Sequence, residues 1–251
     1  MSTTHGVGVR LTGVERRYGD RVVLRGVNLE IRPGEIMAIL GQSGTGKSVL
    51  LRQIIGLERP DAGEVRVGDL PLATYLALPP DEKPFRIAMV FQSAALLASL
   101  SVRDNVALRL RERGRLSGVA IDAIVADALA QVELSDALDR FPGDLSGGMR
   151  KRVAIARALA IDPELILYDE PTAELDPILT EQIAGLIRQI HEARGSTQVV
   201  VTHNLPLARA IADRVAVLAD GRVVDCCPPS ALPASTHPLT REFLRAATLG
   251  T

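Results

Sequence analysis

Short apolar runs separated by polar turns are the clearest pattern along the chain. Four of these runs are almost entirely apolar, as expected for buried strands: 36–40, 87–91, 165–168 and 199–201. Apolar and polar residues instead alternate between positions 7 and 31, with a turn from Tyr18 to Asp20. This alternation predicts antiparallel strands rather than a helix.

Apolar residues at helical spacing occupy the region between the second and third buried runs. Positions 121–132 carry them at every third or fourth residue, which predicts an amphipathic helix. Ser101 to Asp104 has the form of a capping box that opens an earlier helix. Prolines between 68 and 85 argue against long regular elements there. Region 93–145 therefore reads as a helical insertion between strands of the main sheet.

Buried strands joined by helices predict an α/β fold. We expect a mostly parallel core sheet, an antiparallel β subdomain and a helical subdomain at about 93–145. Residues 1–251 are expected to form a single domain that ends in a C-terminal tail at about 226–251. That tail is rich in proline and closes with a short amphipathic stretch that includes Phe243.

Composition excludes several classes of protein. The 251 residues include 47% hydrophobic and 24% charged residues, with a formal net charge of −1, so the basic excess of nucleic-acid binders is missing. No run approaches the roughly 18 apolar residues of a membrane span, and the first residues do not resemble a secretion signal. We expect a cytoplasmic protein without direct membrane insertion. The adjacent Cys226 and Cys227 are expected to stay reduced.

A glycine-rich stretch between the first buried run and an apolar helix carries the strongest chemical signal. It reads GQSGTGKS and consists of Gly41, Gln42, Ser43, Gly44, Thr45, Gly46, Lys47 and Ser48. Glycines let backbone N–H groups curl around phosphate oxygens, and the helix that follows points its positive end at them. Lys47 adds a positive charge, and Ser48 offers an oxygen to Mg²⁺. The stretch predicts a nucleoside triphosphate site.

Polar residues at the ends of the other buried strands could complete this site. Gln92, Asp169, Glu170 and His203 each follow such a strand. Ligands of open α/β sheets bind at the carboxyl ends of the strands. An Asp there suits Mg²⁺ near Ser48, and the neighbouring Glu can activate a water molecule. For Gln92 taken alone, a solvated loop amide is the simpler interpretation.

Three further features have a functional and a structural interpretation. Tyr18 could stack on a base beside the nucleotide site or pack against its sheet. Ser146, Gly147 and Gly148 head a basic helix and form a second anion-binding end, although an isolated motif of this kind is usually an ordinary cap. The apolar stretch 94–97 is either a contact surface or part of the core.

In their order and approximate spacing, these pieces resemble the ATP-binding cassette (ABC) transporter ATPases over nearly the whole chain. The resemblance rests on GQSGTGKS, Gln92, LSGGM at 145–149, LILYDE at 165–170, AELD at 173–176 and His203. It implies the P-loop NTPase fold and an ATPase that uses ATP and Mg²⁺.

The resemblance also implies how ATP and the metal would be held. Tyr18 would stack on adenine, and the loop from Gly41 to Val49 would bind the phosphates. Ser48 and Gln92 would ligate Mg²⁺, with Asp169 supporting that site.

Catalysis and assembly follow from the same resemblance. Glu170 would be the general base, and Lys47 would neutralise phosphate charge. His203 would contact the γ-phosphate and steady the attacking water. Ser146 to Gly148 would close over the ATP of a second copy, with Asp176 near the seam, so that a homodimer would hold two ATP molecules.

Within the family, three stretches are most similar to the ATPases of Mla/Mce-type lipid transporters: 91–110, the LSGGM segment and 237–244. This implies a peripheral subunit on the cytoplasmic face of the inner membrane, bound to an integral-membrane permease and to a membrane-anchored lipid-binding subunit. Met149, Glu174 and Asn204 depart from the commonest family residues, but none removes a phosphate or metal ligand. The alternatives are another ABC importer or lipoprotein-release system and, less favoured, a soluble ABC ATPase acting on DNA or ribosomes.

Overall fold

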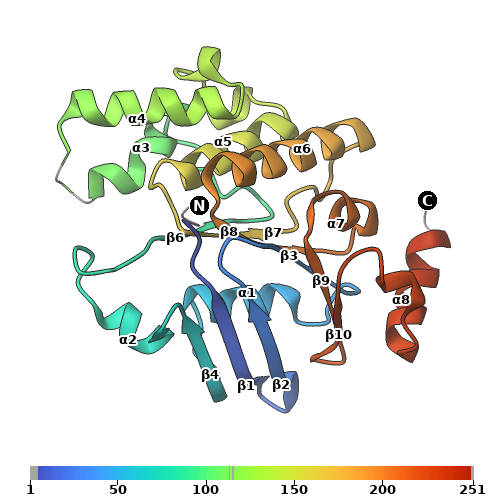
Figure 1. Ribbon diagram of the computed structural model, residues 1–251. Helices are drawn as coiled ribbons and strands as arrows, with labels where there is room; N and C mark the ends of the chain where they lie inside the picture. Colours follow the sequence, from blue (N-terminus) through green and yellow to red (C-terminus); the bar gives the residue numbers. More distant parts are fainter. Residues whose placement is uncertain (1–4, 113, 115, 250–251) are drawn as a thin grey trace.

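The computed structural model describes residues 5–112, 114 and 116–249, and its centre is a six-stranded sheet in the order β10-β9-β3-β8-β7-β6 (Figure 1). The strands are β3 (Ile36–Leu40), β6 (Ile87–Val90), β7 (Leu165–Asp169), β8 (Thr197–Thr202), β9 (Arg214–Ala219) and β10 (Arg222–Cys227). All neighbouring pairs are parallel except β9 and β10, which form a hairpin. The predicted α/β fold with a mostly parallel core sheet is confirmed.

A second, antiparallel sheet in the order β2-β1-β4-β5 covers one side of the molecule. Its strands are β1 (Val9–Tyr18), β2 (Arg21–Ile31), β4 (Ala62–Val67) and β5 (Leu70–Pro71). Helix α1 (Lys47–Ile55) lies between the two sheets (Figure 1), and its buried Leu50, Leu51 and Ile54 belong to one core with residues of both. Full burial of such a side chain contributes about 1.5–3 kcal/mol. This packing fixes the start of α1 against the end of β3.

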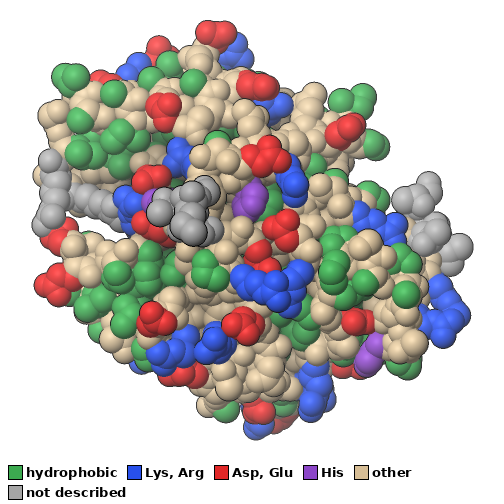
Figure 2. Space-filling model, in the orientation of Figure 1, with side chains coloured by type: hydrophobic (Ala, Val, Ile, Leu, Met, Phe, Trp, Pro, Cys, Tyr) green, Lys and Arg blue, Asp and Glu red, His purple; other side chains and the backbone are tan. Residues whose placement is uncertain are grey.

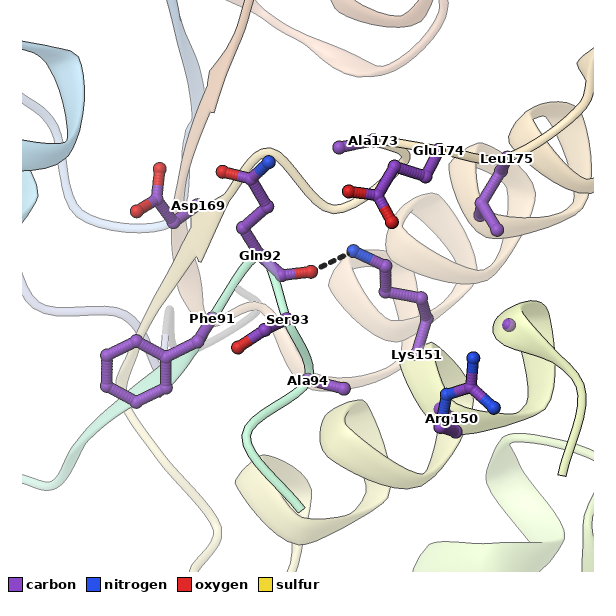
Figure 3. Close-up of a pocket in the computed structure, with 11 residues that line it drawn as sticks. Phe91, Gln92, Ser93, Ala94, Arg150, Lys151, Asp169, Ala173, Glu174 and Leu175 are labelled. Carbon is purple, nitrogen blue, oxygen red and sulfur yellow. Dashed lines mark hydrogen bonds between the residues drawn. The ribbon is translucent and has the colours of Figure 1, made fainter. Parts of the chain in front are cut away.

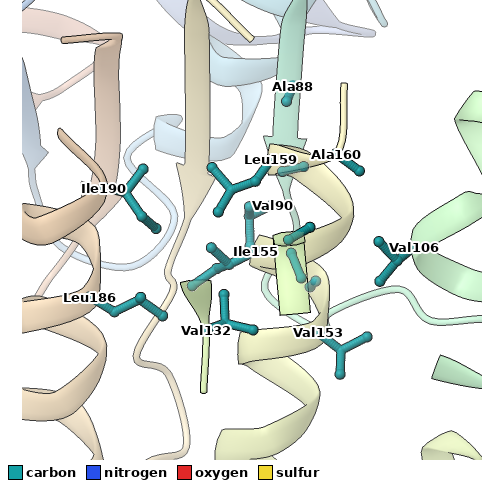
Figure 4. Close-up of a cluster of buried hydrophobic side chains, with 14 of the residues drawn as sticks. Ala88, Val90, Val106, Val132, Val153, Ile155, Leu159, Ala160, Leu186 and Ile190 are labelled. Carbon is teal, nitrogen blue, oxygen red and sulfur yellow. The ribbon is translucent and has the colours of Figure 1, made fainter. Parts of the chain in front are cut away.

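Helices cover the other face of the central sheet. They are α3 (Val102–Glu112), α4 (Gly118–Gln131), α5 (Gly147–Leu159) and α6 (Pro177–Arg194), with short 3-10 turns at Ser135–Ala137 and Pro142–Asp144. Figure 4 shows how Ile155 and Leu159 of α5 pack beside Val90 of β6. The two helices expected between residues 93 and 145 are thus α3 and α4, while the division into subdomains stays a prediction.

Four further helical elements complete the described fold. They are α2 (Leu72–Ala77), α7 (Leu205–Ile211), a 3-10 turn at Leu232–Ala234 and α8 (Pro238–Leu249). Phe243 of α8 is buried in a small core with Leu205 and Val217, so the C-terminal stretch packs onto the β9–β10 edge.

One local expectation needs correction. Ser101 caps α3 by accepting from the Asp104 N–H at 3.2 Å, but the Asp104 carboxylate accepts from the Ser101 hydroxyl at 2.9 Å instead of from its backbone, so half of the predicted capping box is replaced. Helix α5 begins at Gly147, and the Ser146 side chain caps it by accepting from the Met149 N–H.

The surface shown in Figure 2 has acidic and basic side chains interspersed, in line with the net charge of −1. Among the described residues, no helix combines the length and the apolar character needed to cross a membrane.

Candidate functional site

The register of the parallel strands gathers the candidate residues at one edge of the sheet. Leu40 pairs with Thr202, Asp169 pairs with Val201, and Val90 pairs with Tyr168. The segments that follow these strands therefore start side by side, which brings the glycine-rich loop, Gln92, Glu170 and His203 together as expected.

Backbone geometry explains the glycines of the loop. Gly44 and Gly46 have φ values of 84° and 103°, in the left-handed region that favours glycine. At Gly41, a Cβ atom would lie 2.4 Å from the carbonyl oxygen of Leu218. The loop can therefore turn tightly between β3 and α1 only with glycine at these positions.

Lys47 lies almost fully buried beneath the loop. Its Nζ donates to the carbonyl oxygens of Gly41 at 2.9 Å and Gln42 at 3.0 Å, and it lies 3.5 Å from Oε1 of Glu170. Burial lowers the pKa of the Lys47 ammonium, an effect that the nearby Glu170 and Asp169 carboxylates oppose. The Lys47 ammonium is thus held in contact with the backbone of the loop.

Ser48 and Asp169 meet at the side of the loop, where the Ser48 Oγ donates to Oδ1 of Asp169 at 2.9 Å. A hydroxyl and a carboxylate oxygen this close are hard donors of the kind that Mg²⁺ takes beside phosphate oxygens. Burial raises the pKa of Asp169, and the hydrogen bond from Ser48 opposes that shift. No cluster of three His, Cys, Asp or Glu suited to a metal occurs among the described residues. Two oxygens do not fill the coordination shell of Mg²⁺, so the pair suits an ion whose other ligands are phosphate or water oxygens.

Glu170 and His203 form the other half of the strand-end cluster. His203 Nδ1 lies 3.0 Å from Oε2 and 3.1 Å from Oε1 of Glu170, and the His203 backbone N–H donates to Oε2 at 3.3 Å. The Glu170 backbone is left-handed, with φ of 46°, and its side chain is buried. Non-glycine residues in this region are uncommon and cluster at functional sites.

Of these groups, Lys47, Ser48 and Glu170 line a cleft of about 530 Å³, which we call the phosphate-loop cleft, whereas Asp169 and His203 do not line it. Its lining joins the predicted ligands to residues of β2: Tyr18, Arg21, Val23, Ser43, Gly44, Gly46, Lys47, Ser48, Val49, Gln92 and Glu170. Tyr18 is 41% exposed there, but its hydroxyl donates to Glu58 and the Arg16 guanidinium lies 4.8 Å from the centre of its ring. Within the loop, the Thr45 hydroxyl donates to the Gln42 carbonyl at 2.9 Å, which stabilises the conformation of the loop.

The LSGGM segment lies outside the phosphate-loop cleft. Ser146 and Gly148 line neither this cleft nor the second cavity, whereas Gly147 lines the latter, a space of about 520 Å³ beside Gln92 and α5 (Figure 3). Asp176 caps α6 by accepting from the Leu179 N–H at 2.8 Å. Within one chain, these residues are therefore separate from the loop.

Sequence reasoning missed two features of the second cavity. Lys151 lines this cavity and donates to the Gln92 carbonyl. In the sequence, Lys151 is one of several basic residues in its helix, and nothing there indicates this contact. Glu174 has a left-handed φ of 67°. The one available signal was that Glu174 stands where a small residue is frequent.

Comparisons with known proteins place these features in context. A family model described as "ABC transporter" matches residues 24–173. The "probable ribonucleotide transport ATP-binding protein mkl" of Mycobacterium tuberculosis is 37% identical over 245 residues, covering 98% of this chain and 68% of the relative. The "methionine import ATP-binding protein MetN" of Mesorhizobium japonicum is 43% identical over 217 residues, covering 86% and 59%.

A plant relative and a solved structure extend the comparison. The chloroplastic "protein TRIGALACTOSYLDIACYLGLYCEROL 3" of Arabidopsis thaliana is 40% identical over 248 residues, covering 92% of this chain and 71% of the relative. The dimeric structure of a post-hydrolysis state of the ATP-binding cassette MJ0796, bound to ADP and Pi, has a TM-score of 0.77 and 37% identity, covering 88% and 98%.

Proposed function

Because this chain belongs to the ABC transporter family and is the subunit that binds and hydrolyses ATP in such a transporter, we propose that it powers the movement of a phospholipid or another lipid between bacterial membranes. Support comes from the lipid-transporter-like stretches at 91–110 and 237–244. One relative also carries the name of a glycolipid, trigalactosyldiacylglycerol. A methionine importer is the second candidate, because MetN is 43% identical.

The observation that carries the catalytic assignment is the position of Glu170 in the phosphate-loop cleft, bonded to His203 and 3.5 Å from Lys47. Glu170 would accept a proton from the water that attacks the γ-phosphorus. With Nδ1 engaged by Glu170, Nε2 is the His203 nitrogen that would meet the γ-phosphate. Lys47 would leave Glu170 for the phosphates when ATP enters.

The same region of the molecule would hold Mg²⁺ and the adenine ring of ATP. Ser48 and Gln92 would hold Mg²⁺, with Asp169 supporting them, and the ion would neutralise charge on the β- and γ-phosphates. Tyr18 would stack on adenine through the ring face opposite Arg16.

A second copy would complete each site. Ser146 to Gly148 and Asp176 lie outside the cleft of their own chain, so they would cover ATP bound to the partner. The MJ0796 cassette is dimeric, which supports the pairing of two copies, and the two copies would pair head to tail. The dimer would bind an integral-membrane permease, and with it a membrane-anchored lipid-binding subunit, at the cytoplasmic face of the inner membrane.

The cargo is tested by isolating the complex from membranes and identifying its proteins and lipids by mass spectrometry. We expect a permease, bound phospholipid, and ATPase activity that added phospholipid stimulates and methionine does not. Stimulation by methionine alone, with a periplasmic binding protein among the partners, would overturn the lipid assignment in favour of the second candidate.

A further inference from the structure

The segment that follows Gln92 is held by two long cationic side chains of α5. Lys151 Nζ donates to the backbone carbonyl of Gln92 (Figure 3). Arg157, further along the helix, donates to the carbonyls of Ala94 at 2.8 Å and Ala95 at 2.7 Å. One helix therefore binds three carbonyl oxygens of the same short segment.

These contacts are largely shielded from solvent, where a cation without a partner raises the free energy of the folded protein. Lys151 is only 7% exposed, and burial lowers the pKa of both Lys151 and Arg157. The carboxylates of Glu174, Glu170 and Asp169 oppose that shift at Lys151. Figure 3 shows the Glu174 side chain pointing into the space between Gln92 and Lys151. The Lys151 ammonium is thus kept in place by a carbonyl and by negative charge.

The segment itself has an unfavourable backbone shape. Ala94 and Ala95 have φ values of 63° and 47°, both in the left-handed region that residues other than glycine rarely adopt. Such conformations persist where the surroundings over-determine them. Here the surroundings include the bonds from Arg157, the Ala94 N–H bond to the Phe91 carbonyl at 2.9 Å and the burial of Ala94 in the core beside α5, so the shape of the segment depends in part on α5.

Gln92 connects this arrangement to the phosphates. It lines both the phosphate-loop cleft and the second cavity. Helix α5 begins at Gly147 in the LSGGM segment. A shift of the helix would therefore be passed through Lys151 to the residue that faces the nucleotide.

We propose that Lys151 is a positioning residue, which with Arg157 fixes the segment after Gln92 to α5 so that the Gln92 side chain reaches the Mg²⁺ of bound ATP. The inference rests on the proposed role of Gln92 as a metal ligand. It adds that the helix headed by the LSGGM segment, and not the loop alone, sets the position of that ligand.

The test measures metal-dependent nucleotide binding in the full-length protein. Affinity for the non-hydrolysable analogue AMPPNP is determined by calorimetry with MgCl₂ and with EDTA, and the ratio of the two gives the gain due to Mg²⁺. Lys151→Met keeps the apolar stem and removes the donor. We expect it to reduce the gain by about 10- to 100-fold, as changes to residues that hold metal ligands in place do, with the affinity in EDTA unchanged. Lys151→Arg should restore most of the gain.

Lys83→Met is the matched control, because it makes the same substitution at a lysine that lies over the ring of Tyr75 and lines neither the phosphate-loop cleft nor the second cavity. It should keep the full gain. A similar loss in this control, or a parallel loss of affinity in EDTA for Lys151→Met, would show a general structural effect and overturn the inference.

A double-mutant cycle separates this inference from the proposed function. If Lys151 acts through Gln92, then Lys151→Met should cost nothing further in a Gln92→Ala background. Additive losses overturn the positioning role while leaving Gln92 as a ligand. An unchanged gain in Gln92→Ala alone overturns both the ligand role and the inference built on it.

Discussion

His203 touches the Glu170 carboxylate twice, with Nδ1 at 3.0 Å from Oε2 and with a backbone N–H that donates to the same oxygen at 3.3 Å. Because this backbone contact needs no particular side chain, part of the orientation of Glu170 is built into the end of β8. The imidazole adds the part that a substitution can remove.

Glu170→Gln should lower the ATPase rate by about 10²- to 10⁴-fold, the usual contribution of a general base. ATP binding should persist or tighten, because Lys47 no longer pairs with a carboxylate 3.5 Å away. Steady-state phosphate release and equilibrium ATP binding measure the two effects. An undiminished rate would sink the catalytic assignment.

His203→Ala should reduce kcat more than it changes KM for ATP, since it loosens the base and leaves the phosphate loop intact. The loss could reach about 100-fold, because a misplacement of roughly 1 Å at a reacting group can cost that much. Steady-state kinetics give both constants. A change in KM with kcat unchanged would instead assign His203 to ATP binding.

Ser146→Arg tests, by subunit mixing, whether two copies of the chain share each ATP site. Ser146→Arg and Lys47→Ala should each be inactive alone, because each damages both sites of a symmetric dimer. In a mixed dimer with shared sites, one site receives intact Lys47 from one chain and intact Ser146 from the other. Mixing should therefore restore up to about a quarter of wild-type activity. If each site were built within one chain, mixing would restore nothing.

Tyr18→Ala should weaken ATP binding by about 1–3 kcal/mol if the ring stacks on adenine. Tyr18→Phe keeps the ring and loses only the hydroxyl bond to Glu58, so it should bind ATP like the wild type. Calorimetric titration distinguishes the two. Equal losses in both variants would point to the Glu58 bond and not to stacking.

Gly41→Ala should lower the free energy of unfolding by about 1–3 kcal/mol, because the new methyl would lie 2.4 Å from the Leu218 carbonyl oxygen. Gly185→Ala is the control: it lies in α6 with nothing within 4 Å of the added Cβ, and it should stabilise the helix by about 0.5–1 kcal/mol. Denaturant unfolding followed by circular dichroism measures both. Equal stability of the two variants would contradict the packing described for the loop.

Much of the site was predictable because its residues stand at strand ends. Apolar runs identify buried strands without knowledge of their partners, and in a parallel sheet the segments after neighbouring strands lie together. The loop from Gly41 to Ser48, Glu170 and His203 could be assigned on this basis, and the fold class with them. The capping of α3 was only half predicted, because the Asp104 carboxylate had another donor within reach.

The sequence by itself determined which residues are candidates for binding phosphate and metal, since residue type and local spacing decide that chemistry. The tertiary structure alone decided how the residues are held. Lys47 and His203 both lie against the Glu170 carboxylate, and the carbonyls of Gln92, Ala94 and Ala95 are bound by Lys151 and Arg157 of a helix distant in sequence. Long side chains can reach many partners, and no periodic pattern indicates which one they choose. Packing settles that choice, because a buried cation must find an oxygen where the fold provides one.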